Sequence, residues 1–424
     1  MKTDIVIVGC GAAGLFSALN APKDKKIIIV TKDALENSDS FLAQGGICVL
    51  RDEDDYDCFY EDTMRAGHYE NKPESVDIMI RSSREIINEL VDYGVRFEKD
   101  GDDFAYTKEG AHSKSRILFH QDETGKEITS HLLSAVKKLP NVTFIENYTM
   151  VDIISENNLC YGIIGHNKKG EFSYILADYT IFATGGIGGL FTHSTNFPHL
   201  TGDAIAVSLK HNITLEHIDY IQIHPTTFYQ KGVGREFLIS ESVRGEGAIL
   251  LNSKGERFVN ELLPRDVVAN AIFDEMRKEG SENVWLSLSA IPEKEIKSHF
   301  PHIYQHCLDA GYDITKESIP VVPSQHYFMG GIKVDKNSLT SMQRLYAVGE
   351  TSCNGVHGKN RLASNSLLES LVFAKRAMQD IVNNYMPINY SKNVIINTEE
   401  YDDYQEKYKQ AVLLAIEKER NSHE

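Results

Sequence analysis

The sequence has 424 residues, and its 44 Lys and Arg set against 61 Asp and Glu give a formal net charge of −17. A chain of this length exceeds one typical domain, so we expect roughly two or three. The negative charge argues against nucleic acid or an anionic membrane as a partner, and no run of about 18 apolar residues could span a bilayer. A site for an acidic ligand would therefore need Arg and His concentrated locally.

The cysteines and the N-terminus indicate a cellular location. Six cysteines form no C-x-x-C pair and no metal-like cluster, a usage typical of reduced thiols in the cytosol. Asp4 interrupts a very short apolar run near the N-terminus, which does not resemble a signal peptide. We therefore expect a cytoplasmic protein.

The N-terminal segment has the pattern of a βαβ unit. A strand over Asp4–Val8 precedes a glycine-rich turn, followed by a helix over Leu15–Asn20 and a strand over Lys26–Val30. A G-x-G-x-x-G between strand and helix predicts a dinucleotide site, where the glycines allow a tight turn, close approach to a pyrophosphate and helix packing. The motif does not separate NAD from FAD. The residues of the turn are Gly9, Cys10, Gly11, Ala12, Ala13 and Gly14.

The end of the second strand departs from the usual pattern. An acidic residue is expected there to bind the ribose hydroxyls, whereas the sequence reads Thr31-Lys32. Either Lys32 contacts the nucleotide or Asp33 replaces the missing acid.

The next two hundred residues predict further helices and strands of the same domain. Capping-box spacing of Thr124 and Glu127 predicts a helix start, and an apolar stripe that stops at Gly94 predicts another helix. Ile145 and the apolar runs 151–154, 161–164 and 172–176 predict a short meander, followed by a separate strand over Tyr179–Phe182.

The character of the chain changes near residue 215, and we expect an inserted domain. A loop-rich segment contains a predicted hairpin of Ala248–Leu251 with Phe258–Val259 and a helix over Val267–Lys278. Leu345–Val348 then returns to the first sheet. The predicted boundaries are 1–217 and 327–388 for the two parts of the dinucleotide-binding domain, 218–326 for the insertion and 389–424 for a helical C-terminal segment.

The segment His357–Ser370 predicts an anion site. It places Arg361 in a loop before a helix whose Ser366 and Glu369 have capping-box spacing. The N-terminus of a helix presents free N–H groups and a positive dipole end, which suit an anion such as a reduced flavin ring. An adjacent Arg suits a carboxylate.

Four stretches resemble the flavin-binding elements of the succinate dehydrogenase and fumarate reductase flavoprotein family, in the family's order. They are Ser38–Gly46, Ala183–Gly189, Thr201–Asp203 and Ala347–Glu350. The resemblance implies an α/β fold, with a Rossmann-like FAD-binding domain and an inserted α+β capping domain. Besides the glycine turn and Lys32, the implied FAD contacts are Asp39, Ser40, Phe41, Leu42, Ala43, Gln44, Gly45, Gly46, Ala183, Thr184, Gly185, Asp203, Glu350, Ser366 and Leu367.

Asp39 bears on how the flavin is attached. Membrane-linked members of the family carry a histidine at this position that is covalently bound to FAD. A carboxylate cannot form that histidyl bond, so we expect FAD to be bound noncovalently, and electron delivery to a quinone is disfavoured.

Four further motifs match the family's dicarboxylate site. Two supply histidines, His224 with the neighbouring Thr226 and His326, and two supply arginines, Arg265 and Arg361. A four-carbon diacid needs donors at both ends, and Arg can bind a carboxylate through two hydrogen bonds. The resemblance assigns proton transfer to Arg265, a residue that is very hard to deprotonate in proteins.

The segment Thr107–Ser113, T-K-E-G-A-H-S, resembles the L-aspartate oxidases, one branch of the same family. There Glu109 would face the α-ammonium group of L-aspartate, whereas an anion at this place would repel a plain diacid. The resemblance implies hydride transfer from substrate C2 to flavin N5, which gives iminoaspartate in the first step of de novo NAD biosynthesis. Oxygen or fumarate would reoxidise the flavin, and quinolinate synthase would be a partner.

Two alternatives stay open. A soluble fumarate reductase would share the whole site except the region of Glu109. A catalytically silent flavin-binding protein would follow if the C-terminal helical domain, which is longer in most relatives of this branch, were needed for activity.

Overall fold

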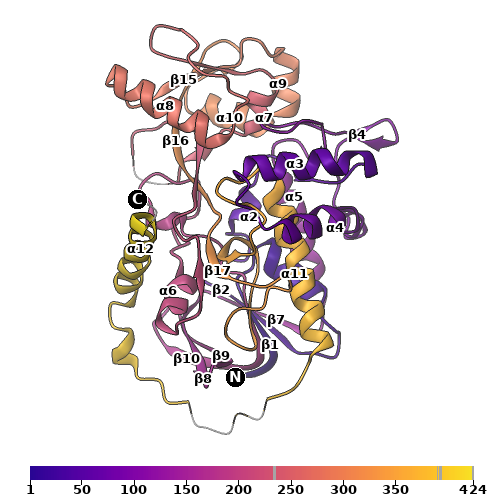
Figure 1. Ribbon diagram of the computed structural model, residues 1–424, viewed down its shortest axis with the longest axis vertical. Helices are drawn as coiled ribbons and strands as arrows, with labels where there is room; N and C mark the ends of the chain where they lie inside the picture. The colour runs from indigo at the N-terminus through magenta and orange to yellow at the C-terminus, as the bar shows by residue number, and fades with distance from the viewer. Residues whose placement is uncertain (233–234, 389, 391–393, 423–424) are drawn as a thin grey trace.

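The computed structural model describes residues 1–232, 235–388, 390 and 394–422. Its centre is a seven-stranded sheet of order β7-β2-β1-β10-β9-β8, with β18 also paired to β10 (Figure 1). The strands are β1 (Lys2–Val8), β2 (Ile27–Thr31), β7 (Val142–Glu146), β8 (Tyr148–Glu156), β9 (Leu159–Asn167), β10 (Phe172–Phe182) and β18 (Leu345–Ala347). No helix within the described residues is both long and apolar enough to cross a membrane.

Strand β10 joins two parts of the sheet that differ in direction. Its first residues pair antiparallel with β9, and its residues from Leu176 to Phe182 pair parallel with β1. The predicted break between 176 and 179 is therefore wrong, and β10 is continuous there. Asp178, the charged residue within this stretch, is buried, and its carboxylate accepts a hydrogen bond from the Ile388 N–H at 2.9 Å. Ile145 was predicted to belong to the same meander, which is also wrong. It lies in β7, which pairs parallel with β2 at the opposite edge of the sheet from β8.

Helices cover both faces of this sheet and form two apolar cores. The helices α1 (Ala12–Leu19), α5 (Thr124–Val136) and α11 (Asn365–Asn383) pack together over one face, and α6 (Asp203–Lys210) with α12 (Tyr404–Ser422) covers the other. Figure 1 shows α11 and α12 on opposite sides of the sheet. These positions explain why the strands read as nearly continuous apolar runs.

The segment between β12 and β16 builds a second, antiparallel sheet with its own apolar core. Its order is β13-β12-β16-β15-β14 (Figure 1, upper part). The elements are β12 (Ile221–Phe228), β13 (Phe237–Leu238), α7 (Glu241–Gly245), β14 (Ile249–Leu251), α8 (Arg265–Glu279), β15 (Val284–Ser287), α9 (Glu293–His299), α10 (Pro301–Asp309) and β16 (Ile319–Phe328). The boundary of the inserted domain at 218–326 stays a prediction.

The predicted hairpin in this segment is wrong. Strand β14 pairs with β15, and within the described residues Leu251 and Arg257 form only an isolated bridge across the expected turn. The turn itself is present, since the Asn252 N–H donates to the Glu256 carbonyl at 3.0 Å. The sequence does not specify which strand an apolar strand pairs with, and β14 pairs with β15 over three residues instead of with the segment that follows the turn.

The remaining elements complete the chain. They are α2 (Asp39–Leu42), β3 (Ile47–Cys48), η1 (Glu53–Asp55), α3 (Tyr56–Ala66), α4 (Pro73–Asp92), β4 (Lys99–Asp100), β5 (Asp103–Phe104), β6 (Ile117–Leu118), η2 (Gly188–Leu190), β11 (Leu215–Glu216), β17 (Gly331–Lys333), η3 (Gly349–Thr351), β19 (Ser352–Cys353) and η4 (Thr398–Tyr401).

The start of α5 has the predicted position but not the predicted cap. Thr124 is already inside the helix, and its hydroxyl donates to the Gly45 carbonyl at 2.7 Å. Glu127 accepts instead from the N–H of Arg96 at 3.0 Å. The two side chains bond distant segments, so the capping box is absent although the helix begins where its spacing indicated.

A buried ion network holds the loop that contains Glu109. Arg116 has no exposed side-chain surface and donates to Asp55 through Nε and Nη2 and to Asp62 through Nη1, at 2.7–3.1 Å. Its Nη1 also lies 3.0 Å from Nδ1 of His112, whose pKa falls to about 4 because of burial and of the Arg116 cation. The network ties α3 to the loop and fixes the loop's path.

Replacing Arg116 by Met is expected to destabilise the fold by about 3 kcal/mol, because Asp55 and Asp62 would lose the cation that compensates their burial. Urea unfolding of the holoprotein measures this change. Lys114→Met is the matched control, since Lys114 is exposed and only approaches Asp55 at 4.0 Å. A loss below about 1 kcal/mol for Arg116→Met, or an equal loss for both variants, would contradict the assignment.

Candidate active site

One large cavity lies where the two sheets meet. It encloses about 1680 Å³ of space between atoms, including its open mouth. Its walls come from the β1–α1 turn, the end of β2, α2, the segments after β10 and β18, and the starts of α8 and α11. A cavity of this size can hold a dinucleotide together with a second, smaller ligand.

The glycine turn lies at one end of the cavity and is crowded against its neighbours. Gly9 has a φ of 115°, and a Cβ there would lie 2.0 Å from the Ala183 carbonyl oxygen. A Cβ on Gly14 would lie 2.2 Å from the Gly9 carbonyl oxygen, so Gly14 serves helix packing and does not line the cavity. Helix α1 begins at Ala12, earlier than predicted, and its N-cap Gly11 makes no side-chain bond. The Ala12 N–H at the helix start donates to the Ser40 hydroxyl at 3.0 Å, so the α2 segment, which also lines the cavity, is bonded to the glycine turn.

Lys32 lines the cavity, whereas Asp33 does not. The Lys32 ammonium group donates to the His199 carbonyl at 2.9 Å and to Thr201 Oγ1 and Asp203 Oδ2 at 2.8 Å each. It thus fixes the loop that leads into α6 beside the predicted nucleotide site. The Lys32–Asp203 ion pair joins two residues that sequence reasoning had treated separately.

Asp39 and Glu350 are two half-buried carboxyl groups in the wall of the cavity. Asp39 accepts from the Phe197 N–H at 3.0 Å, and Glu350 accepts from the Phe328 N–H at 2.9 Å. Burial raises the pKa of Asp39 to about 7, and burial together with Asp39 raises the pKa of Glu350 to about 8. Asp39 Oδ2 and Gln44 Oε1 are buried without a hydrogen-bond partner. Since buried polar atoms normally have partners, these atoms fit the polar groups of a cofactor.

The start of α11 differs from the predicted capping box. Ser364 is the N-cap with a φ of 62°, and no side chain caps the helix. The Ser366 hydroxyl accepts from Arg361 Nη1 at 2.9 Å, and Glu369 bonds Asn354. Because the terminal N–H groups receive no side-chain cap and Ser366 and Leu367 line the cavity, this helix end can face an anionic ring.

Two histidines face each other from the paired strands β12 and β16. The rings of His224 and His326 have centroids 5.1 Å apart. His224 Nδ1 contacts the backbone of Thr226, and its Nε2 is buried without a partner. His326 Nδ1 lies 2.7 Å from the Thr195 hydroxyl. Burial and then the nearby Arg265 cation lower the pKa of both rings well below the ordinary value, so both are neutral at neutral pH.

Thr226 and Phe41 are placed differently from the other predicted contacts. The hydroxyl of Thr226 donates to the Ile239 carbonyl at 3.1 Å, and neither Thr226 nor Phe41 lines the cavity. Thr226 touches the site only through its backbone contact with His224. All other predicted site residues except Gly14 line the cavity.

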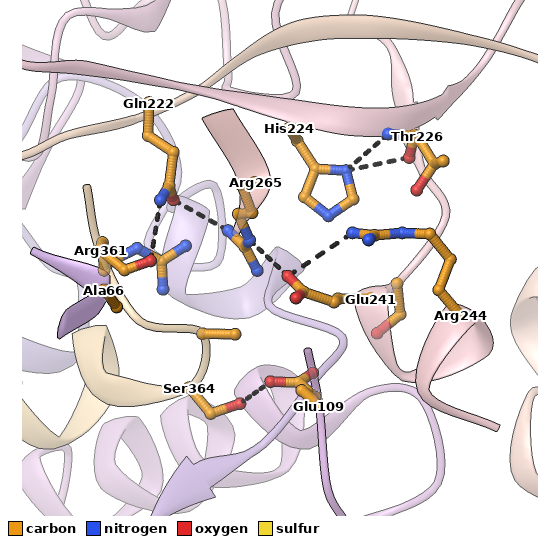
Figure 2. A network of polar contacts seen from close by, with 12 residues as sticks. Ala66, Glu109, Gln222, His224, Thr226, Glu241, Arg244, Arg265, Arg361 and Ser364 are labelled. Carbon is orange, nitrogen blue, oxygen red and sulfur yellow. Dashed lines mark hydrogen bonds and ion pairs between the residues drawn. The ribbon is translucent and has the colours of Figure 1, made fainter. Parts of the chain in front are cut away.

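Gln222 connects the two predicted arginines, as Figure 2 shows. Its Oε1 accepts from Arg265 Nη1 at 2.9 Å, and its Nε2 donates to the Arg361 carbonyl at 2.9 Å. Arg361 also stacks over the Tyr327 ring at 4.4 Å, and burial lowers the pKa of its guanidinium to about 10. Sequence reasoning missed Gln222, because an amide beside a histidine motif has no charge or spacing signal of its own.

Glu241 supplies the negative charge between buried arginines (Figure 2). It accepts from Arg265 Nε at 2.5 Å and lies 3.6 Å from Arg244. Arg244 is fully buried and donates to the Glu261 carbonyl at 2.6 Å. The i,i+3 spacing of Glu241 and Arg244 could have indicated an ion pair, but nothing in the sequence connects Glu241 to Arg265.

Glu109 is buried in the same wall, close to the arginines but not bonded to them. Its Oε1 accepts from the Ser242 hydroxyl at 2.9 Å and its Oε2 from the Ser364 hydroxyl at 2.6 Å. No ion pair joins Glu109 to a Lys, Arg or His within the described parts of the chain. Burial and then the charge of Glu241 raise its pKa. The site therefore holds one carboxylate without a cation among several cations.

The glycine turn, the uncapped start of α11 and the unpartnered polar atoms fit a flavoprotein of the FAD-binding class. A family model described as FAD binding domain matches residues 4–367, and FAD is the cofactor of that family. The chain belongs to this family and, within it, to the L-aspartate oxidases.

Relatives with similar sequences and a solved structure with a similar fold support this placement. An L-aspartate oxidase of Clostridium perfringens is 51% identical over 401 residues, which cover 94% of this chain and 90% of that one. An L-aspartate oxidase of Pseudomonas aeruginosa is 38% identical over 89% of this chain and 74% of its own. Among solved structures, E. coli quinol fumarate reductase FrdA matches with a TM-score of 0.85 and 28% identity, over 99% of this chain and 74% of that chain.

Gly9→Ala is expected to weaken FAD binding about ten- to hundredfold, because a Cβ would add roughly 1–3 kcal/mol of backbone strain and would overlap Ala183. Titration of apoprotein with FAD measures the dissociation constant. Gly101→Ala is the matched control, since Gly101 also has a positive φ, 65°, but no atom lies within 4 Å of its Cβ position. Unchanged FAD affinity in Gly9→Ala would contradict the role of the turn.

Proposed function

We propose that this protein oxidises L-aspartate to iminoaspartate with FAD as its cofactor. The observation that carries this proposal is the position of Glu109, a buried carboxylate without a cationic partner. It lies in the same cavity as Arg265, Arg361 and the two neutral histidines. A diacid with an α-ammonium group is the ligand that complements this arrangement.

The charges of the site support an amino diacid over a plain diacid. Buried charges in proteins are usually paired, and the two carboxylates of L-aspartate would pair with arginines and accept from histidines. Its ammonium group would pair with Glu109. Succinate or fumarate has no cation to offer, so an ionised Glu109 would repel it and lose its own compensation.

The chain's residues would bind and orient the substrate. Arg361, His224 and His326 hold the carboxylates, and Glu109 accepts a hydrogen bond from the ammonium group. FAD, when bound, supplies the acceptor for the hydride that leaves C2. Enclosure between the two sheets positions C2 and excludes water, and such positioning supplies a large share of rate enhancement.

The substrate nitrogen must also lose a proton before the C=N bond can form. We assign proton transfer to Arg265 on the family resemblance. Its Nε donates to Glu241 at 2.5 Å, and this buried carboxylate compensates the charge of the guanidinium and orients it. Gln222 holds the other end of Arg265 at 2.9 Å and fixes its direction.

The proposal also covers the electron acceptor, the cellular location and a protein partner. Oxygen or fumarate would reoxidise the flavin, and the likeness to a quinol fumarate reductase supports fumarate as a ligand of the same site. Six cysteines without disulfides fit a cytoplasmic enzyme. Iminoaspartate is the product that quinolinate synthase would consume, which is the basis for proposing that enzyme as a partner.

Anaerobic mixing of the holoprotein with L-aspartate is expected to bleach the flavin absorbance. In Glu109→Gln the rate of bleaching per substrate concentration should fall about 30- to 100-fold, since a hydrogen bond between two charges is lost. Absent bleaching with dye-linked reduction of fumarate would instead support a fumarate reductase. Absent turnover with every dicarboxylate would support a silent flavoprotein.

Acid precipitation is expected to leave all of the flavin in the supernatant, because Asp39 occupies the position of the histidine that attaches FAD in membrane-linked relatives. Absorbance of supernatant and dissolved pellet measures the division. Asp39→His offers a matched comparison, since it restores the side chain that the attachment needs. Yellow colour retained on the wild-type pellet would contradict noncovalent binding.

A further inference from the structure

Two serine hydroxyls hold the carboxylate of Glu109 from opposite sides. Ser242, in α7, donates to Oε1 at 2.9 Å, and Ser364, at the start of α11, donates to Oε2 at 2.6 Å. Ser242 does not line the cavity and therefore lies behind Glu109 as seen from the ligand. A Cβ on Gly45 would lie 2.6 Å from Oε1, so the carboxylate is also packed tightly from a third side.

The direction of both hydroxyl protons is determined by second donors. Ser240 Oγ donates to Ser242 Oγ at 3.3 Å, and the Gly46 N–H donates to Ser364 Oγ at 3.2 Å. Each serine oxygen thus already accepts a hydrogen bond, and its single proton is free to point at Glu109. Each carboxylate oxygen receives one hydrogen bond and keeps a lone pair for a ligand.

The two serine hydroxyls favour the ionised form of Glu109, whereas its burial and the nearby carboxylate of Glu241 favour the protonated form. Burial and then the charge of Glu241 raise its pKa, while Ser364, Arg265 and Ser242 lower it in that order. The other titratable groups whose charges act on Glu109 or respond to it are Arg244, Arg361 and Cys48. Without the serines, a buried carboxylate beside a second carboxylate would tend to take up a proton.

We propose that Ser242 and Ser364 are positioning residues that set substrate choice, by holding Glu109 ionised and directed at the α-ammonium group of an amino diacid. This inference rests on the proposed oxidation of L-aspartate. Both serines act through Glu109, and Ser242, unlike Ser364, does not line the cavity. Their loss changes the preference between amino and plain diacids, whereas the arginine and histidine contacts common to both ligands stay in place.

The test measures ligand choice in the FAD-loaded protein without turnover. The probes are succinate, which lacks the ammonium group, and L-2-methylaspartate, which carries it but has no hydrogen on C2 to be oxidised. Dissociation constants follow from ligand-induced changes in flavin absorbance. Ser242 is the position to change, because Ser364 also lines the cavity and is the N-cap residue of α11, so its replacement would change more than the bond to Glu109.

Ser242→Ala is expected to weaken L-2-methylaspartate about tenfold, the effect of one hydrogen bond to a charged group. Binding of succinate should stay unchanged or become tighter, because the repelling charge is reduced. Ser242→Thr restores the hydroxyl and should restore the wild-type ratio. Ser83→Ala is the matched control, since Ser83 is a buried serine whose hydroxyl donates to the Ile80 carbonyl at 2.6 Å, away from the cavity.

The pH dependence separates positioning from a merely structural effect. Binding of the amino diacid requires ionised Glu109, so it is lost as pH falls through the pKa of that residue. Removing the Ser242 donor raises this pKa further, and the loss should begin at higher pH in Ser242→Ala. Succinate should show the opposite trend and bind better as pH falls.

Three results would overturn the inference: equal weakening of both ligands in Ser242→Ala, an unshifted pH profile, or no binding of any amino diacid by the wild type. Failure of the proposed function would give a different experimental result. In that case the wild type binds L-2-methylaspartate but L-aspartate does not bleach the flavin, and the ratio of dissociation constants still decides the role of the serines.

Discussion

The site depends on holding two like charges close together in a buried place. Arg265 and Arg361 both face the cavity, and each disfavours the charge of the other. Glu241 compensates Arg265 directly, and Gln222 bonds both residues with its amide, accepting from one and donating to the backbone of the other. The carboxylates of an acidic ligand would compensate the remaining positive charge. The bonds of Gln222 to Arg265 and to the Arg361 carbonyl also join the inserted segment to the loop before α11.

The paired strands β12 and β16 make this arrangement possible. They enter and leave the inserted segment side by side, and their register pairs His224 with Ser324, so that the rings of His224 and His326 lie with centroids 5.1 Å apart. The cofactor side is built by the glycine turn and the start of α11, which belong to the other sheet. The substrate-site residues come from both parts of the chain, with His224 and Arg265 from the segment between β12 and β16 and Glu109 and Arg361 from outside it, so the cavity exists only where the two parts meet.

Sequence reasoning succeeded where a local pattern has a local cause. The glycine turn and the α/β fold were predicted correctly, because strand, turn and helix follow one another within a few residues, and the family resemblance correctly indicated FAD. It failed where a side chain had a distant partner. The capping box at Thr124 is absent, since its hydroxyl bonds the Gly45 carbonyl 79 positions away, and the one at Ser366 is also absent, although its partner Arg361 is only five residues away. The hairpin after β14 and the break in β10 were wrong for the same reason, because β15 and Ile388 lie far away in sequence.

The sequence by itself determined the kinds of groups that this protein brings to its ligands: a glycine turn, two arginines, two histidines and one glutamate in a known order. Only the tertiary structure decided their state. The neutral imidazoles, the compensated Arg265 and the glutamate held by two serines are consequences of burial and of neighbours more than twenty, and for Glu109 more than a hundred, positions away. Charge and hydrogen bonding depend on distance in space, which the order of residues does not specify.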